Sequence, residues 1–263
     1  MKAFDIIKKA ISRLVYPEGL TCAVCESELD ESSRNGLCPD CFVPFVRHCC
    51  ARCGTVLHEK GREYCDRCLK LTSNDNTFDL ARAPYPYEEE SVHKLVWNLK
   101  YGKQPYYAKL MAPPMAELLG RSGIEADIMT YVPLHPKKQR LRTYNQSELL
   151  ARHISEITGL PLVPTLKKTV FTKTSATKLG KSDREKLLAG SFAVTADVKG
   201  KRVLLIDDVF TSGATASECA KTLKAAKAKA VYVLTYATSR GDKPATYDPD
   251  EDYIAKLRGI RAR

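Results

Sequence analysis

The spacing of apolar and polar positions predicts strands and helices that alternate along much of the chain. The apolar run Val203–Ile206 is a short buried-strand signal, followed by two carboxylates, a polar turn and a helical pattern over 214–226. A further strand is predicted over 230–236, and an earlier one over 127–132 precedes a helix at 146–158. Strands that alternate with helices in this way predict an α/β domain built on a parallel sheet.

Two more helices are predicted before the strand at 127–132. Ser91 caps the first, whose apolar side chains up to Leu99 share one face, and the second runs from about Tyr106 to Leu119. The pair Pro113-Pro114 lies inside the second pattern. Because proline lacks the N–H that an α-helix uses, we expect this helix to be kinked or split there.

Three segments before these helices also have readable patterns. Apolar residues at helical spacing predict an amphipathic helix over 1–20, which Pro17 and Gly19 end. We expect it to dock on the protein itself, and a membrane surface or a partner helix is the alternative. Residues 70–80 are polar and predict a linker, and 81–87 predict a short extended piece.

The turn after Val203–Ile206 has the chemistry of a phosphate site. A helix N-terminus offers unpaired N–H groups and a partial positive charge, and small and hydroxyl side chains allow close approach and add donors. The turn residues are Thr211, Ser212, Gly213, Ala214 and Thr215. Asp207 and Asp208 precede them and suit sugar hydroxyls or a metal complex. The predicted ligand is a sugar 5′-phosphate at the carboxyl edge of the sheet.

This stretch has two other interpretations. A buried strand capped by acids is the purely structural one. A Walker A loop is excluded, because no Gly-Lys-Ser/Thr closes the turn.

Positive charge is concentrated in one stretch of the chain. The net charge is +11, and residues 131–190, with 12 Lys and Arg against 4 Asp and Glu, carry most of it. A basic, proline-bounded loop at 133–146 follows the strand at 127–132, and its cations are placed to surround a second anionic group: Lys137, Lys138, Arg140 and Arg142. A solvated basic face is the alternative for any one of these lysines. The polar segment 165–190 has the profile of a mobile active-site loop.

Nine of the ten cysteines lie between residues 22 and 68, where eight of them form Cys-x-x-Cys pairs. In a reducing compartment such pairs indicate metal ligation rather than disulfides, and eight thiolates make two tetrahedral zinc sites. The simplest pairing is sequential, with an interleaved pairing as the alternative, and Cys49 is either a spare thiol or a substitute for Cys50. The expected ligands are Cys22, Cys25, Cys38 and Cys41 in one site, and Cys50, Cys53, Cys65 and Cys68 in the other.

No apolar run reaches membrane-spanning length, and charged residues interrupt the N-terminus where a signal peptide needs an apolar core. We therefore expect a cytoplasmic protein.

The order of these parts resembles the ComF family. The resemblance is carried by the four cysteine pairs and by Leu99-Lys100-Tyr101, by Val132–His135 with Arg142–Gln146, and by Val203–Thr215. It implies a type I phosphoribosyltransferase fold, a parallel sheet flanked by helices and covered by a hood, preceded by a Cys-rich double zinc ribbon. It also implies Mg²⁺ bound with 5-phosphoribosyl 1-pyrophosphate and, in some members, a link to DNA uptake during natural transformation. The chain departs from the family pattern at Thr143-Tyr144, where members usually have Gly-Phe.

The expected organisation is therefore an N-terminal helix, a double zinc ribbon, a phosphoribosyltransferase-like domain and a tail, over 1–20, 21–70, 81–240 and 241–263. One functional hypothesis is transfer of a phosphoribosyl group to a nitrogen acceptor. The alternative is a non-catalytic factor that handles single-stranded DNA with DNA-uptake or recombination proteins, using tyrosines as stacking platforms: Tyr85, Tyr87, Tyr101, Tyr106 and Tyr144. A third is a partner-binding zinc protein with a vestigial nucleotide site.

Overall fold

The structure is a computed structural model that describes residues 20–57, 59, 61–70, 77–171 and 188–239. The expected helix over 1–20 and tail over 241–263 lie outside the described residues, as do most of the linker and the middle of the segment 165–190. The chain divides into two compact units, Met1–Pro44 and Phe45–Arg263. No helix among the described residues is long and apolar enough to cross a membrane.

The larger unit is built on a five-stranded sheet in which every pairing is parallel, so the predicted α/β architecture is confirmed. Four of the strands lie in the order β1-β7-β6-β3, and β2 also pairs with β7. Their bounds are Leu80–Arg82 for β1, Tyr85–Pro86 for β2, Ile128–Tyr131 for β3, Arg202–Phe210 for β6 and Ala230–Thr238 for β7. Two short strands, β4 (Leu166–Lys168) and β5 (Phe192–Val194), form a separate antiparallel pair.

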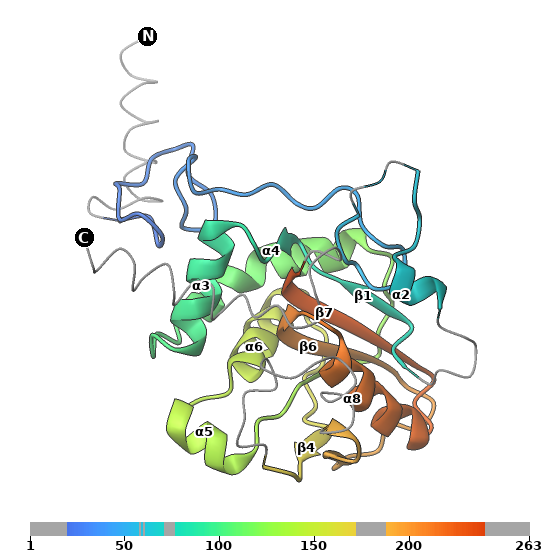
Figure 1. Cartoon of the computed structure of the whole chain (residues 1–263). Helices are drawn as coiled ribbons and strands as arrows, with labels where there is room; N and C mark the ends of the chain where they lie inside the picture. Colours follow the sequence, from blue (N-terminus) through green and yellow to red (C-terminus); the bar gives the residue numbers. More distant parts are fainter. Residues whose placement is uncertain (1–19, 58, 60, 71–76, 172–187, 240–263) are drawn as a thin grey trace, which may run out of the picture. The chain divides into compact units, whose positions relative to one another are not determined.

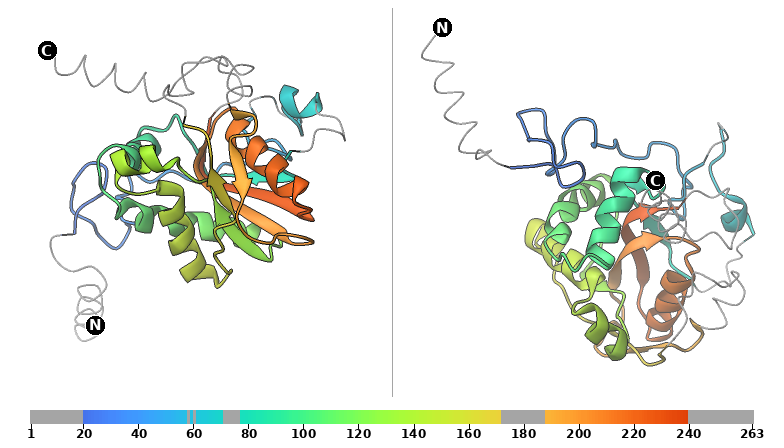
Figure 2. Two further views of the ribbon diagram at one scale, coloured as in Figure 1. Left: turned by 90° about the horizontal axis from the view of Figure 1, so that it is seen from below. Right: turned by 60° about the vertical axis from the view of Figure 1, so that its left-hand side comes forward.

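Helices cover both faces of the sheet (Figure 1). Their bounds are Asp66–Leu69 for α2, Glu90–Lys100 for α3, Tyr107–Arg121 for α4, Pro136–Arg142 for α5, Gln146–Thr158 for α6 and Ala214–Ala225 for α8. The left panel of Figure 2 shows the sheet between the green helices on one side and the orange-red helix α8 on the other. Side chains of a strand point alternately to its two faces, so Val203 and Leu205 join the core under α8 with Ala220 and Leu223.

Strand β6 is longer than predicted. We expected it to end at Ile206, but it continues through both acids to Phe210, which pairs with Thr238 of β7. Pairing with β7 on one side supplies backbone hydrogen bonds along the whole length, and it outweighs the low strand preference of Asp207 and Asp208.

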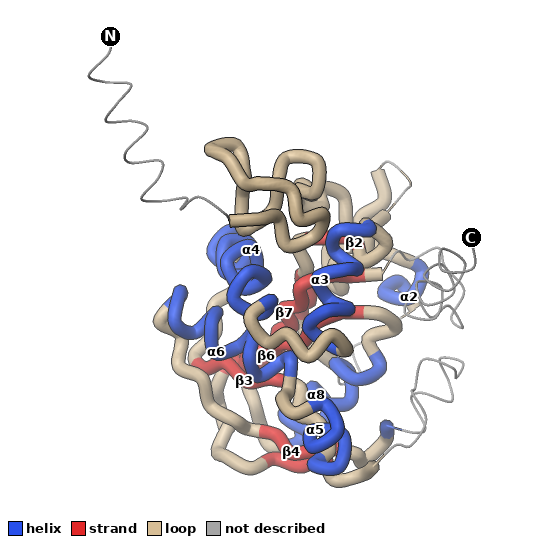
Figure 3. The backbone as a smooth tube through the Cα atoms, turned by 90° about the vertical axis from the view of Figure 1, so that its left-hand side faces the viewer, coloured by secondary structure: helices blue, strands red, loops and turns tan. Residues whose placement is uncertain are grey.

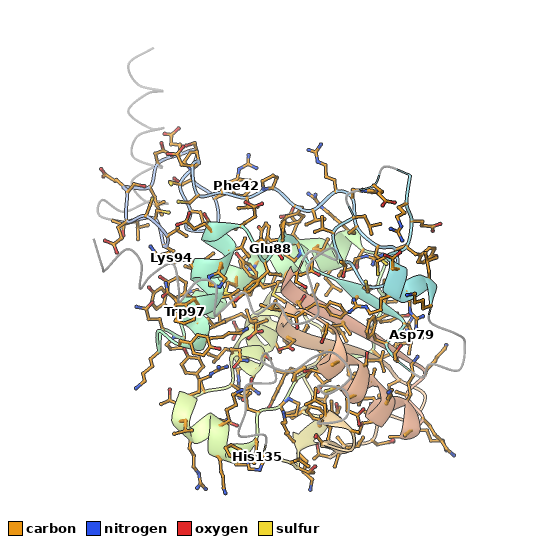
Figure 4. All side chains as sticks on the ribbon, viewed as in Figure 1. Phe42, Asp79, Glu88, Lys94, Trp97 and His135 are labelled. Atoms are coloured by element: carbon orange, nitrogen blue, oxygen red, sulfur yellow. The ribbon has the colours of Figure 1, made fainter. Side chains whose placement is uncertain are left out.

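Two segments expected to be loops contain regular structure. The start of the segment 165–190 forms β4, which pairs with β5 just after the segment, so that Leu166 lies opposite Val194. The basic loop at 133–146 contains helix α5, because Pro136 occupies its first position and the His135 side chain accepts a hydrogen bond from the Lys137 N–H at 3.2 Å. Figure 4 labels His135 at this point.

Two expectations about helices, a split at Pro113-Pro114 and a cap at Ser91, were wrong. The helix α4 is not split at Pro113-Pro114: it runs unbroken, and its buried Met111 and Met115 pack in the core. We attribute this to tertiary packing, which outweighs the two missing N–H groups. Ser91 does not cap α3, whose N-cap is Glu89.

Candidate functional site

The turn between β6 and α8 has a backbone conformation that only glycine adopts without strain. Gly213 is the N-cap of α8 at φ 74°, and a Cβ there would lie 2.6 Å from Cζ of Phe210. A pocket opens at this turn, before a helix of 12 residues whose N-terminal N–H groups have no helical acceptor. The pocket is lined by Asp207, Val209, Phe210, Thr211, Ser212, Gly213, Ala214, Thr215, Ala216, Val233 and Thr235. The five turn residues named from the sequence all line it.

Asp207 lies at the edge of this pocket and is held from the side of α6. Its Oδ1 accepts a hydrogen bond from Ser147 Oγ at 2.7 Å. Burial, and after it the charge of Asp208, raise the pKa of Asp207 to about 7, while the Ser147 hydrogen bond opposes the shift. A carboxyl with this pKa is readily charged when a cation or a hydrogen-bond donor approaches it.

Asp208 is almost fully buried, at 4% exposed, and it is only partly satisfied. Its Oδ1 pairs with Lys100 Nζ at 3.2 Å. Its Oδ2 has no hydrogen-bond partner among the described residues. An unsatisfied buried acceptor costs free energy, so this atom indicates a donor that a ligand or a bound metal's water would supply.

Several cations gather near Asp208. The pKa of Lys138 is lowered first by desolvation from surrounding protein atoms and then by the charges of Arg142, Lys168 and Lys100. The negative charge of Asp208 opposes that shift. Three cations and one carboxylate therefore act on Lys138. A group of cations held close together attracts an anion with more than one charge.

The basic residues of α5 also differ in their individual contacts. Lys137 Nζ lies over the ring of Phe171, 5.5 Å from its centroid, and Arg140 is exposed. The Arg142 guanidinium lies over the Tyr101 ring at 5.1 Å and donates to Gln146 Oε1 at 2.8 Å.

Three residues of this site were missed by sequence reasoning: Lys100, Ser147 and Lys168. Lys100 belongs to the stretch Leu99-Lys100-Tyr101 that carried the family resemblance, and this was a signal that it has a role. Ser147 and Lys168 had no comparable signal, because only the tertiary structure brings Ser147, on α6, and Lys168, on β4, close enough to interact with Asp207.

Eight cysteines form two clusters, grouped in sequential order. Within each cluster the four Sγ atoms lie within 4.8 Å of one another. Cys25 and Cys38 Sγ are 3.6 Å apart, as are those of Cys53 and Cys65. Thiolates bound about 2.3 Å from one tetrahedral zinc ion lie roughly 3.8 Å apart, so both clusters fit that ion. Cys49 lies outside both clusters.

The second cluster is part of the core of the larger unit. Its four cysteines belong to the hydrophobic cluster that contains Phe78, Ala81 and Phe210. The Ala81 N–H donates to the Arg52 carbonyl oxygen at 2.7 Å, which ties the cysteine segment to β1. Apart from α2, the described cysteine-bearing segments are drawn as loop in Figure 3. Metal ligation would therefore supply much of their folding free energy.

Comparisons with known proteins find matches to both the cysteine-rich part and the α/β part of the chain. Residues 11–69 match the double zinc ribbon domain family, and residues 145–261 match the phosphoribosyl transferase domain family. Competence protein F of Haemophilus influenzae is 26% identical over 217 residues, covering 77% of this chain and 90% of that protein. DNA utilization protein YhgH of Escherichia coli K12 is 25% identical over 215 residues, covering 81% of this chain and 87% of that protein.

Among solved structures, a glutamine phosphoribosylpyrophosphate amidotransferase from B. subtilis matches at 20% identity and a TM-score of 0.37, covering 61% of this chain and 38% of that one. A double zinc ribbon followed by a phosphoribosyltransferase domain, together with the two relatives, shows that the chain belongs to the ComF family.

Proposed function

We propose that the protein binds 5-phosphoribosyl 1-pyrophosphate with Mg²⁺ at the turn before α8 and transfers its phosphoribosyl group to a nitrogen acceptor. The observation that carries this proposal is the buried Asp208, whose Oδ2 has no partner among the described residues. Asp208 directly follows Asp207, which lines the pocket at the N-terminus of α8, and a helix N-terminus suits phosphate. Membership of a family with a phosphoribosyltransferase domain supports the same ligand.

Each part of the site has a role in this proposal. The N–H groups and hydroxyls of residues 211–215 hold the 5′-phosphate, and Asp207 and Asp208 accept hydrogen bonds from the ribose hydroxyls. Lys100, Lys138 and other nearby cations bind the pyrophosphate, whose charge grows as its bond to ribose C1 breaks. The acceptor nitrogen forms the new bond at C1. Mg²⁺ supplies charge neutralisation on the pyrophosphate, and carboxylate and phosphate oxygens are the ligands it prefers.

Calorimetric titration of 5-phosphoribosyl 1-pyrophosphate with Mg²⁺ tests the binding step. We expect wild type to bind, and Asp208→Asn to bind about ten- to a hundredfold more weakly, because it loses a charged acceptor. The matched control is Asp79→Asn, since Asp79 precedes β1 at the amino edge of the sheet, away from the turn, as labelled in Figure 4. Absence of heat with wild type would exclude the transferase and favour a vestigial site.

A second candidate function is the handling of single-stranded DNA. Tyr101 and Tyr106 are 48% and 55% exposed, and Arg142 lies over the Tyr101 ring, so an aromatic surface adjoins the cations. Tyr85 and Tyr87 are buried and do not suit this role. The names of the two relatives, a competence protein and a DNA utilization protein, support it. DNA-uptake or recombination proteins would be its partners.

Single-stranded oligonucleotide binding, measured at several salt concentrations, tests this second function. We expect an affinity that falls steeply with salt and is about tenfold lower in Tyr101→Ala, because one stacking contact is lost. An affinity that does not change with salt, or that is undetectable at low salt, would exclude it.

A further inference from the structure

The side chain of Arg67 connects the second cysteine cluster to the turn before α8. Arg67 lies on α2, between two cysteines of the cluster, and is half-buried. Its Nη2 lies 3.5 Å from Cys53 Sγ, and its Nη1 donates a hydrogen bond to the carbonyl oxygen of Ser212. The guanidinium also lies over the ring of Phe210, 5.4 Å from the centroid. One side chain therefore contacts both a candidate metal ligand and the turn, which are far apart in sequence.

The chemistry of these contacts suits arginine. Its planar guanidinium presents several donors in a fixed fork and stacks on aromatic rings, so it can hold a sulfur, a carbonyl oxygen and a ring at once. Four thiolates around one Zn²⁺ leave the cluster with net negative charge, which attracts a cation. The ammonium of lysine is a compact point charge and does not reproduce the fork.

The contact with Ser212 orients the peptide group at the centre of the turn. In a trans peptide the carbonyl and the following N–H point in opposite directions, so the N–H of Gly213 points away from Arg67. Gly213 lines the pocket. Phe210, on which Arg67 lies, packs against Phe78 at 5.5 Å and lies where any Cβ at Gly213 would clash. Arg67 therefore holds both the strand end and the peptide of the turn.

We propose that Arg67 is a positioning residue through which the second zinc ribbon orders the phosphate-binding turn. This inference rests on the proposed function, because it assigns the turn to the 5′-phosphate. Zinc in the ribbon and the ligand at the turn then stabilise each other, since any coupling between two binding sites is reciprocal.

Calorimetric titration of 5-phosphoribosyl 1-pyrophosphate with Mg²⁺ compares four proteins: wild type, Arg67→Ala, Arg67→Lys and Arg62→Ala. Arg62 is the matched control, because it lies on the same ribbon and pairs with Asp66. We expect Arg67→Ala to bind about tenfold or more weakly, Arg67→Lys to be intermediate, and Arg62→Ala to match wild type. Zinc content should stay the same in all four, which separates positioning from loss of the ribbon.

Amide hydrogen exchange at residues 211–215 gives a readout that does not need the ligand. We expect about tenfold faster exchange at the turn in Arg67→Ala, with the strands β3 and β7 unchanged. If wild type does not bind the ligand, the proposed function fails and the exchange rates alone decide the inference. If wild type binds and Arg67→Ala equals it in affinity and exchange, the positioning role is excluded while the proposed function stands.

Reciprocity offers an independent check. Saturating ligand should lower the zinc released to a competing chelator from wild type, and it should have no such effect in Arg67→Ala. Equal protection in both proteins would contradict the coupling.

Discussion

At the scale of single residues, two adjacent carboxylates of β6 have opposite surroundings. Asp208 forms an ion pair with Lys100 through its Oδ1. Asp207 faces Ser147 and the pocket, and burial beside another carboxylate raises its pKa to about 7. Side chains alternate along a strand, so neighbours in sequence reach different environments. The pair therefore contains one carboxylate held by a cation and one that responds to pH.

Asp207→Asn should change how stability depends on pH. An acid whose pKa is raised on folding contributes most to stability below its unfolded pKa, and that contribution is lost as the pH rises through the folded pKa. The variant stays neutral, so we expect it to match wild type near pH 4 and to exceed it by on the order of 4 kcal/mol near pH 8. Urea unfolding at both pH values measures this difference.

Asp127→Asn is the control of opposite sign. Hydrogen bonds from Arg202 lower the pKa of Asp127 to about 2, so its contribution is present above the unfolded pKa and lost as the pH falls through the folded one. This variant should be less stable than wild type near pH 8. Equal stability of Asp207→Asn and wild type near pH 8 would contradict the role assigned to burial.

At the scale of elements, the second ribbon is attached to the sheet through close backbone contact with β1. Gly54 has a φ of 68°, and a Cβ there would lie 2.7 Å from the carbonyl oxygen of Ala81. The same strand end donates the Ala81 N–H to Arg52. A glycine at this position is required both by its backbone conformation and by the approach of β1.

Gly54→Ala should loosen this attachment. We expect it to lower the free energy of unfolding by roughly 2–4 kcal/mol, because alanine would have to adopt a left-handed backbone conformation and its Cβ would also clash with the backbone of β1. Gly61→Ala is the matched control: its φ is 83°, but a Cβ there meets no atom within 4 Å. It should cost only about 1 kcal/mol. Chemical unfolding of the zinc-loaded chain measures both, and equal losses would show that the contact with β1 contributes nothing.

At the scale of the whole molecule, the two cysteine clusters belong to different compact units. The first lies within Met1–Pro44, whereas the second lies within Phe45–Arg263 and shares the core beneath α8. Clusters of the same chemistry therefore have different consequences for the phosphoribosyltransferase domain.

Removing one ligand from each cluster should separate these consequences. Cys25→Ser and Cys53→Ser should each lower the zinc content from about two ions to about one per chain. Cys53→Ser should also lower the melting temperature of the larger unit by at least about 5 °C, while Cys25→Ser leaves it unchanged. Metal analysis and thermal circular dichroism measure the two effects. An equal drop in both variants would contradict the separate roles of the clusters.

Local sequence patterns were sufficient to predict much of the structure of this protein. The alternation of strands and helices, the eight paired cysteines and the turn at 211–215 all depend on residues close together in sequence, and their physical requirements can be read there. Reasoning from local sequence failed where contacts between distant segments decide how far a strand or helix continues. Strand β6 continues to Phe210 because β7 pairs with it, and α4 continues through two prolines, which we attribute to packing of its buried face.

The sequence by itself therefore determined the fold class, the two cysteine clusters and the location of the polar turn that lines the pocket, because each follows from local backbone preference and side-chain type. Only the tertiary structure brought Lys100, Ser147 and Lys168 to the two carboxylates, and Arg67 to the turn. Those contacts join residues separated by tens of positions or more, so packing of the sheet, and no local pattern, decides them.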